Sequence, residues 1–180
     1  MNLQTYQELA IKTIKWRGTE ELDCDHMIVG MFSEINEMMD ALMGPIDPVL
    51  IKEELGDMSW YVVNYATIRK ISISQQTDVG HFGLQSYVYY ASKLTDIMKK
   101  WMIYNKEFTP QGRKEEEEIV QKLVDCICNF AYDDKKVDIN EAWEMNINKL
   151  HKGRYKNAVY SDDAANNRNL EEERNKLEGK

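Results

Sequence analysis

Four acidic residues stand in two short segments at a spacing that could bind a metal ion. Glu34 and Glu37 lie in "FSEINEMM", and Glu54 and Asp57 lie in "EELGD". The members of each pair are three residues apart, so on a helix both carboxylates of a pair lie on the same face. The alternative is that both pairs lie on solvated helix faces, where such spacings are common.

The connection between the two segments places both pairs at matching heights. Residues 44–47 ("GPID") break the chain, and so short a connection makes the flanking helices antiparallel neighbours. Glu37 lies six residues before the end of the first helix, and Glu54 lies six residues after the start of the second. Glu34 and Asp57 each lie nine residues from the same two helix ends. Because a helix rises about 1.5 Å per residue, we expect the four carboxylates to meet in one patch.

Four facing carboxylates repel each other near an apolar core unless a counter-charge is present. A divalent cation supplies that charge, and all-oxygen ligation is typical of Mg²⁺ and Mn²⁺ rather than Zn²⁺. The three histidines have no ligand spacing, and the pair Cys126 and Cys128 has no further Cys or His nearby. The sequence therefore indicates a Mg²⁺ site, with Mn²⁺ as a substitute.

Apolar residues recur every three or four positions and predict an all-α fold, an antiparallel bundle of about six helices. The expected helices span residues 2–16, 22–43, 48–69, 87–104, 114–132 and 139–150. Asp47 before Pro48, and Asp138 in the capping box "DINE", are the expected N-caps.

The remaining segments are expected to be less regular. Residues 70–83 are interpreted as a loop or a short extended segment. The prediction assigns residues 1–156 to a single all-α domain. Residues 157–180 form a polar C-terminal tail, either a short helix or flexible.

The middle of the chain carries a faint repeat of the acidic hairpin. "FSEINEMMDA" (32–41) resembles "ASKLTDIMKK" (91–100), and "EELGDMSWYVV" resembles "QKLVDCICNF". In this alignment Asp125 matches Asp57, whereas lysines replace Glu34 and Glu54. The bundle could therefore consist of two degenerate helical hairpins, the second without its glutamates, although helical hairpins also resemble each other by chance.

Composition and charge exclude several classes of protein. The net charge is −8 and the pI is about 5.0, so the chain lacks the basic footprint of a general nucleic-acid binder. The acidic run 115–118 is expected to lie on a solvated helix start. Cys24, Cys126 and Cys128 are expected to be reduced, mostly buried thiols. Without a signal-like segment or a run of about 18 apolar residues, we expect a soluble, cytoplasmic protein with no membrane partner.

These motifs resemble those of the MazG-like nucleotide pyrophosphohydrolases, in the all-α NTP pyrophosphatase superfamily that also includes the dimeric dUTPases. The family pattern of ExxE followed by ExxD is matched by Glu34, Glu37, Glu54 and Asp57. The segment "WEMNINKLHKGRY" (143–155) resembles a distal family block with Asn-x-x-Lys-Leu and then Arg-Tyr. Residues 28–66 and 138–178 match well, whereas the hairpin at 81–135 departs from the short members with one hairpin.

The resemblance implies Mg²⁺-dependent hydrolysis of a nucleoside triphosphate, expected to be a dNTP, to the monophosphate and pyrophosphate. A metal-activated water would be the nucleophile. The implied metal ligands are Glu34, Glu37, Glu54 and Asp57, with Glu37 and Glu54 also catalytic. The implied substrate-binding residues are Asn146, Lys149, Arg154, Tyr155, Trp60 and Tyr61. Several have a structural alternative, as a tie between helices, as cations at a helix C-terminus or as aromatic core.

Two other functions remain open from the sequence. One is a dUTPase or a phosphoribosyl-ATP pyrophosphohydrolase-like enzyme of the same superfamily. The other is a non-catalytic helical interaction or regulatory module, which the divergent second hairpin favours. The resemblance also implies a homodimer or homotetramer. Because the tail resembles those of bacterial and phage members, the expected location is the bacterial cytoplasm.

Overall fold

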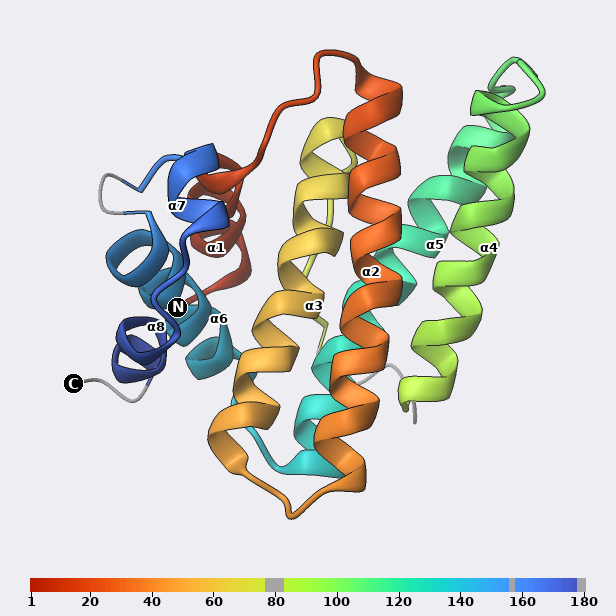
Figure 1. Ribbon diagram of the computed structural model, residues 1–180. Helices are drawn as coiled ribbons and strands as arrows, with labels where there is room; N and C mark the ends of the chain where they lie inside the picture. Colours follow the sequence, from red (N-terminus) through yellow and green to blue (C-terminus); the bar gives the residue numbers. More distant parts are fainter. Residues whose placement is uncertain (77–82, 156–157, 178–180) are drawn as a thin grey trace.

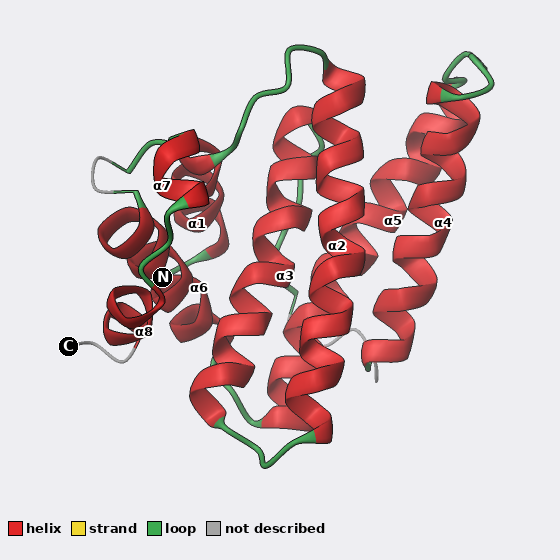
Figure 2. Cartoon of the chain, viewed as in Figure 1, coloured by secondary structure: helices red, strands yellow, loops and turns green. Residues whose placement is uncertain are grey.

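A computed structural model describes residues 1–76, 83–155 and 158–177, except for the side chains of residues 133 and 134. Within these ranges the chain is helical and has no strand (Figure 2), which confirms the all-α prediction. The α-helices are α1 (Leu3–Ala10), α2 (Glu20–Met43), α3 (Pro48–Ile68), α4 (Leu84–Met102), α5 (Pro110–Asn129), α6 (Ile139–Asn148), α7 (Asp162–Asn166) and α8 (Leu170–Leu177). A 3₁₀ turn η1 (Ile11–Thr13) and two π-helical turns, η2 (Phe130–Lys135) and η3 (Lys149–Arg154), continue α1, α5 and α6.

The hairpin of α2 and α3 lies in the middle of the molecule, as Figure 1 shows. Helices α4 and α5 pack together on one side of it, with α4 against α2 and α5 against α3. Helices α1 and α6 pack against α3 on the other side, and α8 covers η3 and α6. The central hairpin that carries the four acids therefore has helices on both sides.

Short-range capping explains where the helices begin. Asp47 accepts a hydrogen bond from the Val49 amide at 2.9 Å, and Pro48 occupies the first turn of α3. Asp138 caps α6 in the same way. The predicted capping box is only half formed, because the Glu141 carboxylate accepts instead from Lys52 at 2.7 Å.

The first helix is shorter than the predicted range 2–16. It ends in η1, and Ile14 has an extended backbone with ψ 140°. The Thr13 hydroxyl donates to the Ala10 carbonyl and accepts from Trp60 Nε1 at 2.9 Å. This side-chain bonding ends the helix and directs the following residues, including Lys15, over the end of the central hairpin.

The two segments predicted to be irregular are the loop at 70–83 and the C-terminal tail. Of the expected loop at 70–83, residues 77–82 lie outside the described residues. The tail, left open as helix or flexible, contains α7 and α8, while residues 156–157 and 178–180 also lie outside the description.

A buried ion-pair network joins the second hairpin to the first, and it corrects the expectation that the run 115–118 is solvated. Glu116 has 0% of its side chain exposed. Its carboxylate accepts from Arg69 Nε at 2.7 Å, from Arg113 at 2.9 Å and from the Tyr65 hydroxyl at 2.6 Å. Glu116 lies on the face of α5 that packs against the core, and two guanidinium groups there balance its charge.

The three cysteines are free and buried, as predicted. Burial raises the pKa of Cys24, Cys126 and Cys128 to about 12. None of the helices in the described ranges offers a stretch both long and apolar enough to cross a membrane.

Candidate functional site

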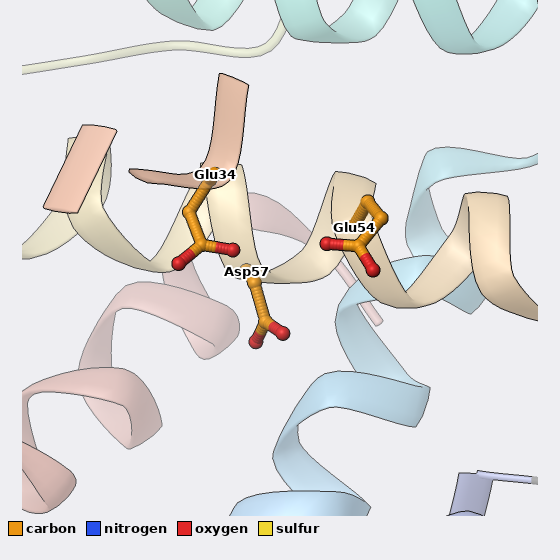
Figure 3. A group of neighbouring side chains, drawn as sticks. All are labelled: Glu34, Glu54 and Asp57. Atoms are coloured by element: carbon orange, nitrogen blue, oxygen red, sulfur yellow. The ribbon is translucent and has the colours of Figure 1, made fainter. Parts of the chain in front are cut away.

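Three of the four predicted acids converge between α2 and α3. One carboxylate oxygen each from Glu34, Glu54 and Asp57 lies within 4.8 Å of the others. Figure 3 shows Glu34 reaching from α2 towards the two acids of α3. Glu34 and Glu54 are buried, with 7% and 5% of their surface exposed. The antiparallel geometry of the hairpin therefore forces three carboxylates into one partly apolar space.

The surroundings of these carboxylates disfavour their charged forms. Burial, reinforced by Asp57, Glu37 and Glu54, raises the pKa of Glu34 to about 9. Burial, with Asp57, Glu37 and Glu53, raises the pKa of Glu54 to about 8. Moreover, Glu54 Oε2 is buried without a hydrogen-bond partner. A buried acceptor without a partner is costly, and a divalent cation among these oxygens would satisfy it, so the donor set fits Mg²⁺ or Mn²⁺.

Glu37 differs from the other three acids. It is exposed on α2, accepts from the Ser33 hydroxyl at 3.5 Å, and is not part of the group of three oxygens. It lines the same cavity as Glu34 and Asp57. Its carboxylate is therefore solvent-accessible beside the buried cluster, a position suited to holding a water molecule.

Asp57 is held by two side chains that were predicted to bind substrate. Asn146 Nδ2 donates to Asp57 Oδ1 at 2.6 Å, and the Lys149 ammonium donates to Asp57 Oδ2. The Tyr6 hydroxyl donates to Asn146 Oδ1 at 2.9 Å, which fixes the amide orientation. The structure thus places Asn146 and Lys149 behind an acid of the cluster, and neither lines the cavity.

The glycine at position 56 makes this arrangement possible. A Cβ atom there would lie 2.7 Å from the Asn146 Cβ and 3.1 Å from the Ala142 carbonyl. Helices α3 and α6 therefore approach closely only because residue 56 has no side chain. In the "LGD" of the sequence, Gly56 allows this close contact, and the next residue, Asp57, is an acid of the cluster.

A cavity of about 300 Å³ opens beside the carboxylates. Acidic side chains line it from α2 and α3, and basic ones line it from residues that flank α1, from η3 and from the tail. The basic side chains are Lys15, Arg154 and Arg168. Oppositely charged groups therefore line one cavity, as would suit an anionic ligand that carries a cation.

The two arginines share one carboxylate. Arg154 and Arg168 each donate two hydrogen bonds to Glu173 of α8, with distances between 2.7 and 3.2 Å. Burial opposes ionisation of Glu173, but the two guanidinium groups lower its pKa to about 2. Two positive charges facing one negative charge leave a net positive charge at this wall of the cavity.

Aromatic rings form the rest of the lining. Trp60 and Tyr61 from α3 pack edge to face at 4.9 Å between ring centroids, and His26 packs against both. Tyr155 and Tyr160 lie across the cavity, with centroids 5.5 Å apart. The predicted residues Trp60, Tyr61 and Tyr155 therefore line the cavity, although Trp60 also contributes to the core.

Gly30 fixes the position of Tyr61. A Cβ atom on residue 30 would lie 2.0 Å from the Tyr61 ring, so Gly30→Ala must displace the ring from the wall of the cavity. We expect this change to weaken ligand binding about tenfold and to lower stability by about 1–3 kcal/mol. Ligand titration and denaturant unfolding measure the two effects. In the control Gly44→Ala, the added atom meets nothing nearer than 3.9 Å, and both quantities should stay unchanged.

Several site residues were not found from the sequence. Glu53 binds Lys149, and Tyr160, Arg168 and Glu173 form the wall from the tail. Glu53 directly precedes the ExxD motif, so its position beside the acids was available as a signal. For the tail the sequence signal is the resemblance of residues 138–178 to the family, which singles out none of these side chains. They reach the site through the packing of α8 on η3.

The candidate site thus unites a triad of carboxylates, two of them buried, with an exposed fourth acid and a cavity with basic and aromatic walls. These groups come from α2, α3, η3 and the tail, which are far apart in the sequence. Comparisons with family models, curated proteins and solved structures return no match, so these features of the cavity must carry the functional interpretation.

Proposed function

We propose that the protein hydrolyses nucleoside triphosphates, dNTPs in the first place, to the monophosphate and pyrophosphate with the help of Mg²⁺ or Mn²⁺. The observation that carries this proposal is the cluster of two buried acids, Glu34 and Glu54, with the half-buried Asp57, beside a cavity with basic and aromatic walls. A triphosphate needs cations around its oxygens, and a nucleobase needs a flat apolar surface. The cavity offers both within reach of the acids.

The position of each residue in the site suggests its proposed role. A divalent cation held by Glu34, Glu54 and Asp57 would neutralise phosphate charge and acidify a bound water. Arg154 and Arg168 would hold phosphate oxygens at the opposite wall, because Glu173 balances only one of their two charges. Lys15, in the segment after η1, also lines the cavity, and Asp162 balances its charge.

Glu37 is the proposed general base. Its carboxylate is exposed and lines the cavity next to Glu34, so it can accept a hydrogen bond from a water that enters from solvent. In this role it would remove the proton as the water attacks the α-phosphorus and the bond to the leaving pyrophosphate breaks. Glu54, which is buried and does not line the cavity, acts by holding the cation.

The base would stack on the aromatic wall. Tyr61 packs directly against Gly30 and makes an edge-to-face contact with Trp60. Tyr155 and Tyr160 face the same cavity from the other side. A planar ligand between these rings would gain apolar contact on both faces.

The test is a Mg²⁺-dependent screen of the common ribo- and deoxyribonucleoside triphosphates together with dUTP and phosphoribosyl-ATP, with release of pyrophosphate as the readout. We expect turnover of at least one of them, loss of turnover with chelator, and recovery with Mn²⁺. Cleavage of dUTP alone or of phosphoribosyl-ATP alone would assign the protein to one of the two related enzymes. Absence of turnover on all of these nucleotides would contradict the enzymatic proposal.

We further propose a homo-oligomer, supported by an exposed apolar stripe on α2. Its residues recur at heptad-like spacing and are Leu22, Val29, Phe32, Met39 and Met43. We expect a solution mass at a multiple of 21.1 kDa, and Met39→Glu should reduce it to that of the single chain. Light scattering after gel filtration measures both. Tyr132→Glu, on the exposed surface of η2, is the control that should leave the mass unchanged.

A further inference from the structure

Lys149 is a buried cation to which the proposed mechanism gives no task. Only 1% of its side chain is exposed, and its ammonium group binds Asp57 and, at 3.2 Å, Glu53. Lysine is almost never buried to this degree without a specific partner. Both of its acidic partners line the cavity, but Lys149 does not. It therefore provides a fixed positive charge behind the carboxylates.

This lysine uses up part of the binding capacity of Asp57. Lys149 occupies Oδ2 and Asn146 occupies Oδ1. By contrast, Glu54 Oε2 is buried without a partner. A metal ion can therefore bind best among the oxygens of Glu34, Glu54 and Asp57. Between Asp57 and Glu53, the Lys149 ammonium group already binds the carboxylate oxygens.

The second hairpin contains an aspartate held in the same manner. Asp125 has 0% exposure, accepts from Gln121 Nε2 at 2.8 Å on one oxygen and from Lys122 at 3.2 Å on the other. In the repeat alignment it corresponds to Asp57, and Lys93 and Lys122 stand in the places of Glu34 and Glu54. An amide and an ammonium group thus bind this buried aspartate, and among the described residues it belongs to no acidic triad.

Two-metal sites for phosphoryl transfer hold their ions about 3.5–4 Å apart, bridged by a shared carboxylate. The obvious position for a second ion here lies between Asp57 and Glu53, and the Lys149 ammonium group occupies it. We propose that Lys149 is an internal cation in the place of a second metal ion, so that each chain binds one divalent ion, among Glu34, Glu54 and Asp57. This inference rests on the proposed function, because it presupposes that the acidic cluster binds a metal.

Titration calorimetry with Mn²⁺ tests the inference without requiring activity. We expect one Mn²⁺ per wild-type chain. In Lys149→Met, a side chain of similar length without charge, Asp57 and Glu53 lose their ammonium partner, and two Mn²⁺ should bind. Lys152→Met is the matched control, because Lys152 is exposed on the same turn η3, and it should bind one. Lys149→Arg, which keeps the charge, should also bind one.

The outcomes separate this inference from the proposed function. No Mn²⁺ bound by the wild-type chain would contradict the proposed metal site itself. Two Mn²⁺ bound by the wild-type chain, or one bound by Lys149→Met, would overturn only the role of Lys149. If Lys149→Met folds only with Mn²⁺ present, as followed by circular dichroism, the metal replaces the lysine as inferred. If millimolar Mn²⁺ does not restore its fold, the inference is wrong.

Discussion

The variant Glu34→Gln should lose nearly all activity and yet melt at a higher temperature than the wild type when both are free of metal at pH 9. Exchange of a residue that merely orients a metal ligand lowers activity about 10–100-fold, so loss of a ligand should lower it at least about 100-fold. The gain in stability has a separate cause. Glu34 is buried among Asp57, Glu37 and Glu54, and its pKa is raised to about 9, so the charged form is destabilising.

The size of the gain depends on pH. Below about pH 4.5 the Glu34 carboxyl is protonated in both the folded and the unfolded chain, and the substitution should change the melting temperature little. Above that pH the advantage of glutamine should grow by up to about 1.4 kcal/mol per pH unit and reach several kcal/mol by pH 9, because the unfolded chain releases a proton that the folded chain retains. Each kcal/mol should raise the melting temperature by about 2–4 °C for a chain of this size. Pyrophosphate release and calorimetric melting measure the two effects.

Asp40→Asn is the control for this variant. Asp40 lies on the same helix, is exposed and accepts only a long hydrogen bond of 3.4 Å from Asn36. We expect neither activity nor melting temperature to change. Wild-type activity in Glu34→Gln would remove Glu34 from the site, and a lower melting temperature at pH 9 would mean that the substitution disturbs packing instead.

The second large effect is a pH dependence of stability that a divalent cation removes. The pKa values of Glu34 and Glu54 rise from 4.5 to about 9 and about 8 on folding. Between these limits the folded chain binds more protons than the unfolded chain, so the free energy of unfolding falls as pH rises. The slope is at most about 1.4 kcal/mol for each pH unit and each carboxyl.

Saturating Mg²⁺ or Mn²⁺ should flatten this slope, because a cation favours the deprotonated carboxylates and replaces their protons. The measurement is denaturant unfolding from pH 6 to pH 9, with and without metal. Glu34→Gln should retain only the contribution of Glu54. A metal-free protein whose stability rises with pH over this interval would contradict the assigned electrostatics of the cluster.

The fold and the acidic cluster could be predicted because they depend on local regularities. Helical periodicity placed α2 and α3, and Asp47 with Pro48 marked the start of the second of these helices. Since both helices rise by the same amount per residue, counting from their connection was enough to bring Glu34 opposite Asp57. The same counting includes Glu37, but it carries no information on burial. The structure leaves Glu37 exposed while Glu34 is buried.

The remainder depends on contacts between distant segments, which the local pattern cannot specify. The resemblance predicts phosphate binding for both Lys149 and Arg154. Lys149 instead binds Asp57 and Glu53 and does not line the cavity, whereas Arg154 lines the cavity and binds Glu173 of the tail. The polar tail has no pattern of apolar residues, so the local pattern does not predict its contribution to the cavity. That contribution depends on the packing of α8 on η3. The prediction that Glu116 is solvated is wrong for the same reason. Of its two arginine partners, Arg113 lies on the same helix, but Arg69 comes from the end of α3.

The burial of the three cysteines offers a practical route to observing the tail. With pKa values near 12, their thiols stay protonated at neutral pH and react slowly with maleimides. A cysteine introduced on the exposed side of α8, for example at Glu171, would then be the preferred point of attachment for a fluorescent or spin label. Such a probe would report whether α8 stays seated on η3 when a nucleotide enters.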